Sequence, residues 1–297
     1  MSPSKFKNAN IVYFSGTGGT TRIDLLIRKY LEEYGVTSNV IPLEHNTYSK
    51  NNNHEIRNTA LLIVLFPVHA FDAPEPIYKW VKSLSQGLKT STVIISVSAG
   101  GDIWLNSACR VGIIKKLKKR NFNIIYEKMM IMPSNFMIAT EKQLSMWLLK
   151  VLPLKIENIV KEIISGKKLR IKPTFGGRLL TLLCKSEKLG AKTFAKSFKV
   201  KPNCNGCGWC AKNCPMNNIV MRESEPVFHW NCVACLRCVY GCPKNSIDTK
   251  IYSFVVIKEG YNLEKLEKQV SKIDLQPVEN INDNFLFNGI KDYIKNI

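Results

Sequence analysis

The sequence has no long apolar stretch. A membrane-spanning helix needs about 18 or more apolar residues in succession, whereas the run 60–66 is short and Lys150 interrupts the apolar segment around Trp147. The first ten residues, MSPSKFKNAN, are polar and contain no apolar core of a secretory signal. A membrane-spanning or secreted protein is therefore not expected, and we predict a cytoplasmic location.

Acidic residues are scarce. The 297 residues include 43 Lys and Arg but 23 Asp and Glu, which gives a formal net charge of +20. Residues 166–201 alone hold 11 basic residues and one acidic residue. Such a surface can simply be solvated, or it can attract an acidic protein, lipid headgroups or nucleic acid. Because no helix-turn-helix and no basic motif with interleaved aromatics is present, specific nucleic-acid binding is not expected.

Cysteines are abundant and regularly placed. Eight of the ten lie between positions 204 and 242, in two runs of the pattern C-x2-C-x2-C-x3-C-P. The second run repeats the first at an offset of 28 residues. Such spacing indicates metal or cluster ligands, since a disulfide framework does not require it. Two four-cysteine zinc sites are the alternative, but three cysteines at two-residue gaps followed by Cys-Pro are typical of iron–sulfur loops.

Residues 200–248 resemble the two-cluster bacterial ferredoxins, a small α+β fold. The resemblance implies two [4Fe-4S] clusters, with the fourth cysteine of each run crossing to the other cluster. Cluster I would take Cys204, Cys207, Cys210 and Cys242, and cluster II would take Cys232, Cys235, Cys238 and Cys214. We expect a hairpin between the runs, a small core of Ile219, Val227, Phe228 and Ile247, and packing roles for His229 and Trp230.

The N-terminal region predicts a phosphate-binding loop. A β-branched and aromatic run at 10–14 leads into Ser15, Gly16, Thr17, Gly18, Gly19 and Thr20, and a helical pattern follows over 22–34. A strand, a Gly/Thr loop and a helix N-terminus form an anion cradle. Thr21 stands where the dinucleotide fingerprint needs glycine, and the P-loop Gly-Lys-Ser/Thr is absent. The loop does resemble the phosphate loop of flavodoxins, which implies FMN.

Alternating strand and helix patterns extend this resemblance. Strands are predicted at 38–41, 59–66, 91–97 and 123–131, and helices at 76–84, 106–120 and 141–164. We expect a flavodoxin-like, doubly wound, parallel five-stranded sheet with its ligand beyond the strand ends. By resemblance, two loops would flank the flavin ring: Pro67, Val68, His69, Ala70 and Phe71 in one, and Ser98, Ala99, Gly100 and Gly101 in the other. His69 and Phe71 are the stacking candidates, with Trp104 the weaker one.

The remaining segments carry no ligand pattern. Residues 166–199 predict a basic connector with one helix over 178–198, whose Leu179, Leu182, Leu183, Leu189 and Phe194 would pack between domains. Contact of this helix with a membrane surface is the alternative. Cys109 and Cys184 are expected to be packing residues, although Cys109 could be a reactive thiol. The tail 251–297 predicts a strand at 251–257 and a helix with apolar positions Leu263, Leu266, Val270 and Ile273.

The combination resembles the flavodoxin–ferredoxin fusion proteins of anaerobes. It implies a flavodoxin-like domain at 1–165, the connector at 166–199, a ferredoxin domain at 200–250 and an extension at 251–297. We predict an electron-transfer protein that joins two [4Fe-4S] clusters to one FMN, with redox partner proteins that are acidic. The alternative is an iron–sulfur flavoenzyme that reduces a small substrate, with His69 or Asp102 as proton donor.

Overall fold

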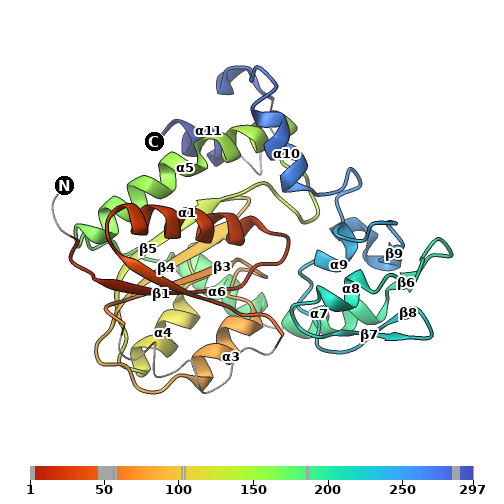
Figure 1. Ribbon diagram of the computed structural model, residues 1–297, viewed down its shortest axis with the longest axis horizontal. Helices are drawn as coiled ribbons and strands as arrows, with labels where there is room; N and C mark the ends of the chain where they lie inside the picture. The colour runs from red at the N-terminus through yellow and green to blue at the C-terminus, as the bar shows by residue number, and fades with distance from the viewer. Residues whose placement is uncertain are drawn as a thin grey trace.

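The computed structural model describes residues 4–45, 56, 59–101, 103, 105–184, 187–282 and 288–296. A helix-flanked sheet formed by the N-terminal half lies beside a smaller cysteine-rich unit, defined here as residues 199–248 (Figure 1). Asp102 and Trp104, two residues considered for the flavin site, lie outside the described residues, as do Phe285 and Phe287 of the tail.

The N-terminal sheet is parallel throughout, with strand order β2-β1-β3-β4-β5. Its strands are β1 (Asn8–Tyr13), β2 (Thr37–Pro42), β3 (Leu61–Pro67), β4 (Ser91–Ser98) and β5 (Asn123–Ile131). This order reverses direction between β1 and β3, which is the flavodoxin-like topology with its ligand site at that switch point. The predicted fold class is therefore confirmed.

Helices cover both faces of the sheet. Helices α1 (Gly19–Glu33) and α5 (Lys142–Ile164) pack on one face, and α3 (Glu75–Ser83) and α4 (Val111–Lys119) pack on the other. Because successive strand side chains point to opposite faces, Ile11 contributes to the first core and Val12 to the second. Helix α4 begins five residues later than predicted, since the Asn106 side chain donates to Ser98 Oγ and to the Gly101 carbonyl and holds a turn instead.

The cysteine-rich unit repeats its backbone as well as its sequence. Two antiparallel pairs, β6 (Lys199–Val200) with β9 (Ile247–Asp248) and β7 (Ile219–Arg222) with β8 (Glu225–Phe228), accompany the short helices α8 (Trp209–Lys212) and α9 (Arg237–Tyr240). Helices α8 and α9 stand 28 residues apart, as the cysteine runs do. Left-handed backbone also recurs at that offset, at Gly206 and Ala234, Gly208 and Leu236, and Asn217 and Asn245.

The small core of this unit follows the prediction except at two positions. Ile219, Phe228 and Ile247 are buried, and β7 and β8 form the expected hairpin. Val227 is half-buried, because the alternation of the strand turns Pro226 and Phe228 inward. Trp230 is not a packing residue: its exposed ring contacts the Lys196 ammonium at 5.3 Å.

The connector forms two helices where the sequence predicted one. They are α6 (Phe175–Leu183) and α7 (Glu187–Lys196). Phe194 is buried against Phe198 and Tyr252 as expected, but Leu179, Leu182 and Leu183 are exposed. The predicted packing of these three leucines between domains is wrong, because helical spacing alone does not say which side of a helix meets the protein. Cys109 is buried and Cys184 is half-buried.

The C-terminal segment packs mainly on the sheet domain. The predicted strand at 251–257 is wrong: the Asp248 carboxylate accepts from the Lys250 N–H, and the 3₁₀ helix η2 (Lys250–Val255) follows. Helix α10 (Leu263–Val270) forms as predicted but ends before Ile273, and α11 (Asn288–Lys295) follows η3 (Val278–Asn280). Both α10 and α11 lie against α5. Among the described residues, no helix has the length and apolarity needed to cross a membrane.

Candidate functional site

The predicted phosphate loop lies between β1 and α1, at the carboxyl end of the central strands. Ser15 and Gly16 are buried, and Gly18 adopts a left-handed conformation (φ +94°) that opens α1. Within the described part of the chain, the backbone N–H groups of Gly16, Thr17 and Gly18 meet no acceptor. Three amide donors beside a helix N-terminus match the chemistry of a phosphate monoester, so the loop fits the phosphate of FMN.

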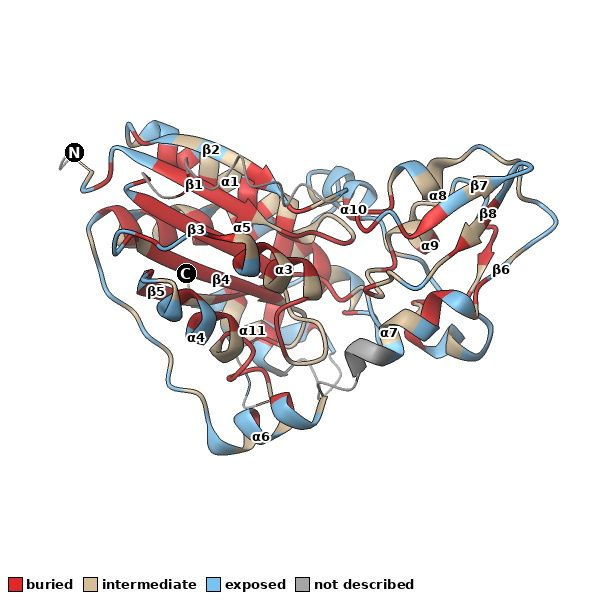
Figure 2. Cartoon of the chain, turned by 90° about the horizontal axis from the view of Figure 1, so that it is seen from below, coloured by how far each residue is buried: buried red, intermediate tan, exposed pale blue. Residues whose placement is uncertain are grey.

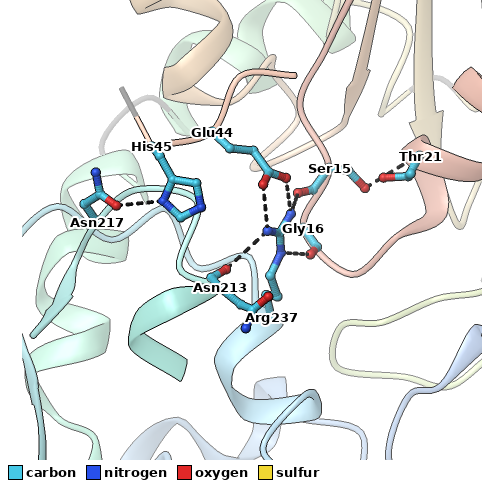
Figure 3. A network of polar contacts seen from close by, with 8 residues as sticks. All are labelled: Ser15, Gly16, Thr21, Glu44, His45, Asn213, Asn217 and Arg237. Carbon is cyan, nitrogen blue, oxygen red and sulfur yellow. Dashed lines mark hydrogen bonds and ion pairs between the residues drawn. The ribbon is translucent and has the colours of Figure 1, made fainter. Parts of the chain in front are cut away.

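Arg237 of the cysteine-rich unit binds the carbonyl side of this loop (Figure 3). Its guanidinium donates to the Ser15 and Gly16 carbonyls, both at 2.7 Å, and to the Asn213 carbonyl at 3.2 Å. It also forms a two-pronged ion pair with Glu44, at 2.5 and 3.1 Å. In a trans peptide the C=O and the following N–H point in opposite directions. Arg237 therefore turns the N–H groups of Gly16 and Thr17 away from itself, toward the open side of the loop.

Further contacts connect the loops that follow β2 and β5 to the cysteine-rich unit and to the phosphate loop. His45 Nδ1 lies 2.7 Å from Asn217 Oδ1, and the His45 N–H donates to the Pro215 carbonyl. Asn135 Nδ2 donates to Thr17 Oγ1 at 2.7 Å. The Tyr240 hydroxyl donates to the Asn135 carbonyl. The cysteine-rich unit is thus attached to the ends of three strands.

The C-terminal extension also reaches the phosphate loop. The Tyr261 hydroxyl donates to the Pro133 carbonyl and lies beside the Thr17 side chain, and burial raises the pKa of this phenol. Arg22, in the first turn of α1, forms an ion pair with Glu267 of α10. The extension thus contributes a wall to this site as well as covering α5.

The two loops predicted to flank the flavin ring lie at adjacent strand ends. Val68 N–H donates to the Val97 carbonyl, and Asn106 fixes the 98–101 loop. Ala70 and Phe71 both have positive φ, a conformation rare in non-glycine residues that is found at ligand sites. His69 is half-buried with its ring edge-on to Phe14 at 6.1 Å. Stacking roles for His69 and Phe71 stay predictions.

The eight regularly spaced cysteines separate into two sets of four. One small cavity is lined by Cys204, Cys207, Cys210 and Cys242, and a second by Cys214, Cys232, Cys235 and Cys238. The fourth cysteine of each run thus crosses to the other set. No group of three or more His, Cys, Asp or Glu side chains in the described residues is placed to hold a single metal ion. Each set instead surrounds a shared space, as the ligands of a cubane cluster do.

Backbone amides point at several of these sulfurs. Asn218 N–H donates to Cys214 Sγ and Ser246 N–H donates to Cys242 Sγ, both at 3.3 Å and again 28 residues apart. Ala234 N–H donates to Cys232 Sγ at the same distance. Burial, with neighbouring thiols adding to it, raises the pKa of Cys232 to about 12 and of Cys235 to about 11. These thiols therefore need a bound cation or cluster to exist as thiolates at neutral pH.

The two candidate sites are in direct contact. A Cβ atom added to Gly16 would lie 2.9 Å from the Cys235 carbonyl oxygen and 3.0 Å from Cys235 Cβ. No side chain fits there, so glycine is required at this position for the close approach of the two loops. Sequence reasoning identified both loops but missed Arg237, Asn135 and Tyr261, because no local motif marks a residue whose partners are 110 or more positions away.

Known proteins resemble two parts of this chain. Residues 203–246 match the family model of the 4Fe-4S dicluster domain. The solved structures that resemble part of the chain include a flavodoxin from Streptococcus pneumonia TIGR4, at 12% identity, TM-score 0.40 and coverage of 53% of this chain and 98% of the other. They also include an archaeal flavodoxin, at 18% identity, TM-score 0.33 and coverage of 52% and 99%. A general stress protein 14 from Treponema denticola, in complex with FMN, has 10% identity, TM-score 0.37 and coverage of 53% and 96%. No curated protein matches the chain significantly.

The chain thus joins a flavodoxin-like domain, assigned from its strand order, to a region that matches the family model of the 4Fe-4S dicluster domain. This is the pairing that the sequence motifs led us to expect.

Proposed function

We propose that this chain transfers electrons between two [4Fe-4S] clusters and one FMN. The clusters, when bound, exchange single electrons, and FMN accepts or donates one or two. The protein's own part is to bind these groups and to fix their separation. The observation that carries the proposal is the contact of Gly16 with Cys235, which joins the phosphate loop to a cluster-ligand loop.

Each cofactor has a defined set of residues. Cluster I is assigned to Cys204, Cys207, Cys210 and Cys242, and cluster II to Cys214, Cys232, Cys235 and Cys238, in agreement with the two cavities. The loop 15–20 is assigned to the FMN phosphate, and the loops 67–71 and 98–101 to the ring. Cluster II is then the one next to the flavin, because Cys235 belongs to its ligand set and Arg237 lies between two of its ligands.

The first experiment counts the cofactors. Anaerobic purification followed by iron, sulfide and flavin analysis should give about eight irons, eight sulfides and one FMN per chain. Eight irons with no flavin, even after FMN is added, would reject the proposed electron junction.

The second experiment tests the contact itself with two glycine-to-alanine variants. Gly16→Ala must push the two units apart, whereas a Cβ at Gly190, on α7 and outside both candidate sites, would meet nothing within 4 Å. After rapid reduction of the clusters, flavin reduction should slow about tenfold or more in G16A and stay within about twofold of wild type in G190A. Equal rates in both variants, at equal cofactor content, would show that the contact does not set the electron path.

A small-substrate reductase is the second candidate function. A cavity of about 1000 Å³ lies between the 133–145 segment, the cysteine-rich unit and the segment 253–269, with Tyr240 and Tyr261 in its wall. Saturable turnover of one small acceptor by the purified protein would favour this function.

If electrons instead pass to protein partners, acidic ones should react faster, and their rates should fall as ionic strength rises.

A further inference from the structure

Helix α6 presents an apolar stripe to solvent. Phe175 is 84% exposed, and Leu179, Leu182 and Leu183 are 49%, 58% and 65% exposed. These residues fall at positions i, i+4, i+7 and i+8, so they share one side of the helix. Figure 2 shows α6 at the lower margin of the molecule, with much of its surface exposed.

The opposite side of α6 is fixed to the sheet domain. Gly177 and Thr181 are buried, and the Thr181 hydroxyl lies 3.1 Å from the Phe71 carbonyl and 2.9 Å from the Gly177 carbonyl, which share its proton. Thr174, which caps the helix by accepting from the Gly177 N–H, lies 3.0 Å from the Ser107 hydroxyl. The helix cannot turn its leucines inward without losing these bonds, so the outward direction of the stripe is built into the fold.

A basic pocket adjoins the stripe. Its volume is about 270 Å³, and its lining includes Arg110, Lys115, Lys118, Arg170 and Arg178. Glu127 is the single acidic residue in the lining, and it already forms ion pairs with Arg110 and Arg170. Lys115, Lys118 and Arg178 are exposed at the rim. Arg178 lies on α6 itself, so the positive charge and the apolar stripe form one surface.

We propose that this surface docks on an anionic lipid membrane. A short helix with Phe and Leu on one side and basic residues beside them is suited to the boundary between headgroups and acyl chains. The pocket can accept a lipid phosphate, and basic residues near an anionic membrane each add attraction. The exposed stripe carries no hydrogen-bonding side chain, which favours a lipid surface over an acidic protein as the occupant.

Vesicle sedimentation of the complete, cofactor-loaded protein tests the proposal. Wild type should bind vesicles of phosphatidylcholine with about 30% phosphatidylserine and should bind pure phosphatidylcholine at least about tenfold more weakly. The double variant Leu179→Ser/Leu182→Ser should lose about tenfold or more of its binding, because two apolar anchors are removed. Lys115→Glu/Lys118→Glu should lose a similar amount.

A matched control comes from the other face of the sheet. Leu25 on α1 and Leu154 on α5 are also exposed, so Leu25→Ser/Leu154→Ser removes the same side chains away from the surface and should bind as wild type does. Iron content and circular dichroism identify folded variants. The proposal is overturned if wild type ignores anionic vesicles or if L179S/L182S binds them normally. A wild-type dimer that L179S/L182S makes monomeric would also overturn it, by assigning the stripe to a second copy.

Discussion

The sheet domain and the cysteine-rich unit differ in what stabilises them. In the sheet domain, β3 runs LLIVLF with every side chain buried, and helices cover both faces. In the cysteine-rich unit, the core is a few residues, and six of the eight cluster-type cysteines are only half-buried. About 50 residues bury too little apolar surface for independent stability. The comparison indicates that burial of apolar side chains can stabilise the sheet domain by itself. The stability of the cysteine-rich unit is instead expected to depend on what its thiolates bind.

Removal of the iron should have the largest effect on this difference in stability between the two units. We expect chelation of the oxidised protein to raise backbone hydrogen exchange about 100-fold or more across residues 199–248, because ligand binding and folding are coupled there. Exchange in β3 and β4 should change little. Mass spectrometry of exchanged peptides from both units gives the comparison within one sample.

Removal of FMN from the iron-loaded protein is the control for that experiment. It should affect the loops 15–20, 67–71 and 98–101 and leave 199–248 protected. Retained protection of 199–248 in the iron-free chain would contradict the proposed dependence of this unit on its clusters.

A smaller effect is expected when the Arg237 contacts that join the two units are removed. Arg237→Met removes donors to two loop carbonyls and the ion pair with Glu44, so the free energy of unfolding should fall by about 3 kcal/mol. FMN should also bind about tenfold more weakly, because the Gly16 and Thr17 amides lose their orientation. Denaturant unfolding and flavin titration measure the two effects.

Two further variants separate the effect of the positive charge of Arg237 from the effect of its hydrogen-bond geometry. Arg222→Met alters an exposed arginine of β7 and should change neither quantity. Arg237→Lys keeps the charge but loses the planar fork, and it should recover only part of the affinity. Full recovery by lysine would show that charge alone, and not the orientation of the two peptides, is what the loop requires.

The sequence was informative wherever a residue's partner is close along the chain. The strand at 123–131 and the helix that follows Glu141 could be predicted almost to the residue, because apolar periodicity and the capping carboxylate are local signals. The 28-residue sequence repeat is accompanied by a repeat in the backbone conformation. The 250–255 segment was missed because a single side-chain contact from Asp248 outweighs its β-branched composition.

What could not be predicted is how the parts meet. Arg237 looks like an ordinary residue between two cysteines, and its contacts at Ser15, Gly16 and Glu44 depend on the packing of two units. The predicted inward packing of the α6 leucines is wrong for the same reason. Helical periodicity identifies an apolar side but does not identify its neighbour.

The smallest expected effect concerns the sheet domain, whose interior is not wholly apolar. Asp24 lies in α1 with its side chain 1% exposed, one carboxylate oxygen has no hydrogen-bond partner among the described residues, and Arg28 is 3.3 Å from the other. Burial raises the pKa of Asp24 from 3.8 to about 6. The folded state therefore holds this proton more tightly than the unfolded state does. The resulting stabilisation is complete below pH 3.8 and is lost as the pH rises through 6.

Between pH 5.5 and pH 8, the free energy of unfolding should accordingly fall by about 1 kcal/mol through this group. Asp24→Asn should remove that part of the slope, and Asp292→Asn, an exposed change on α11, should retain it. Denaturant unfolding of the iron-loaded protein at the two pH values, followed by far-ultraviolet circular dichroism, measures the slopes. Identical slopes in wild type and D24N would mean that the Arg28 pair compensates for the burial of the Asp24 carboxylate.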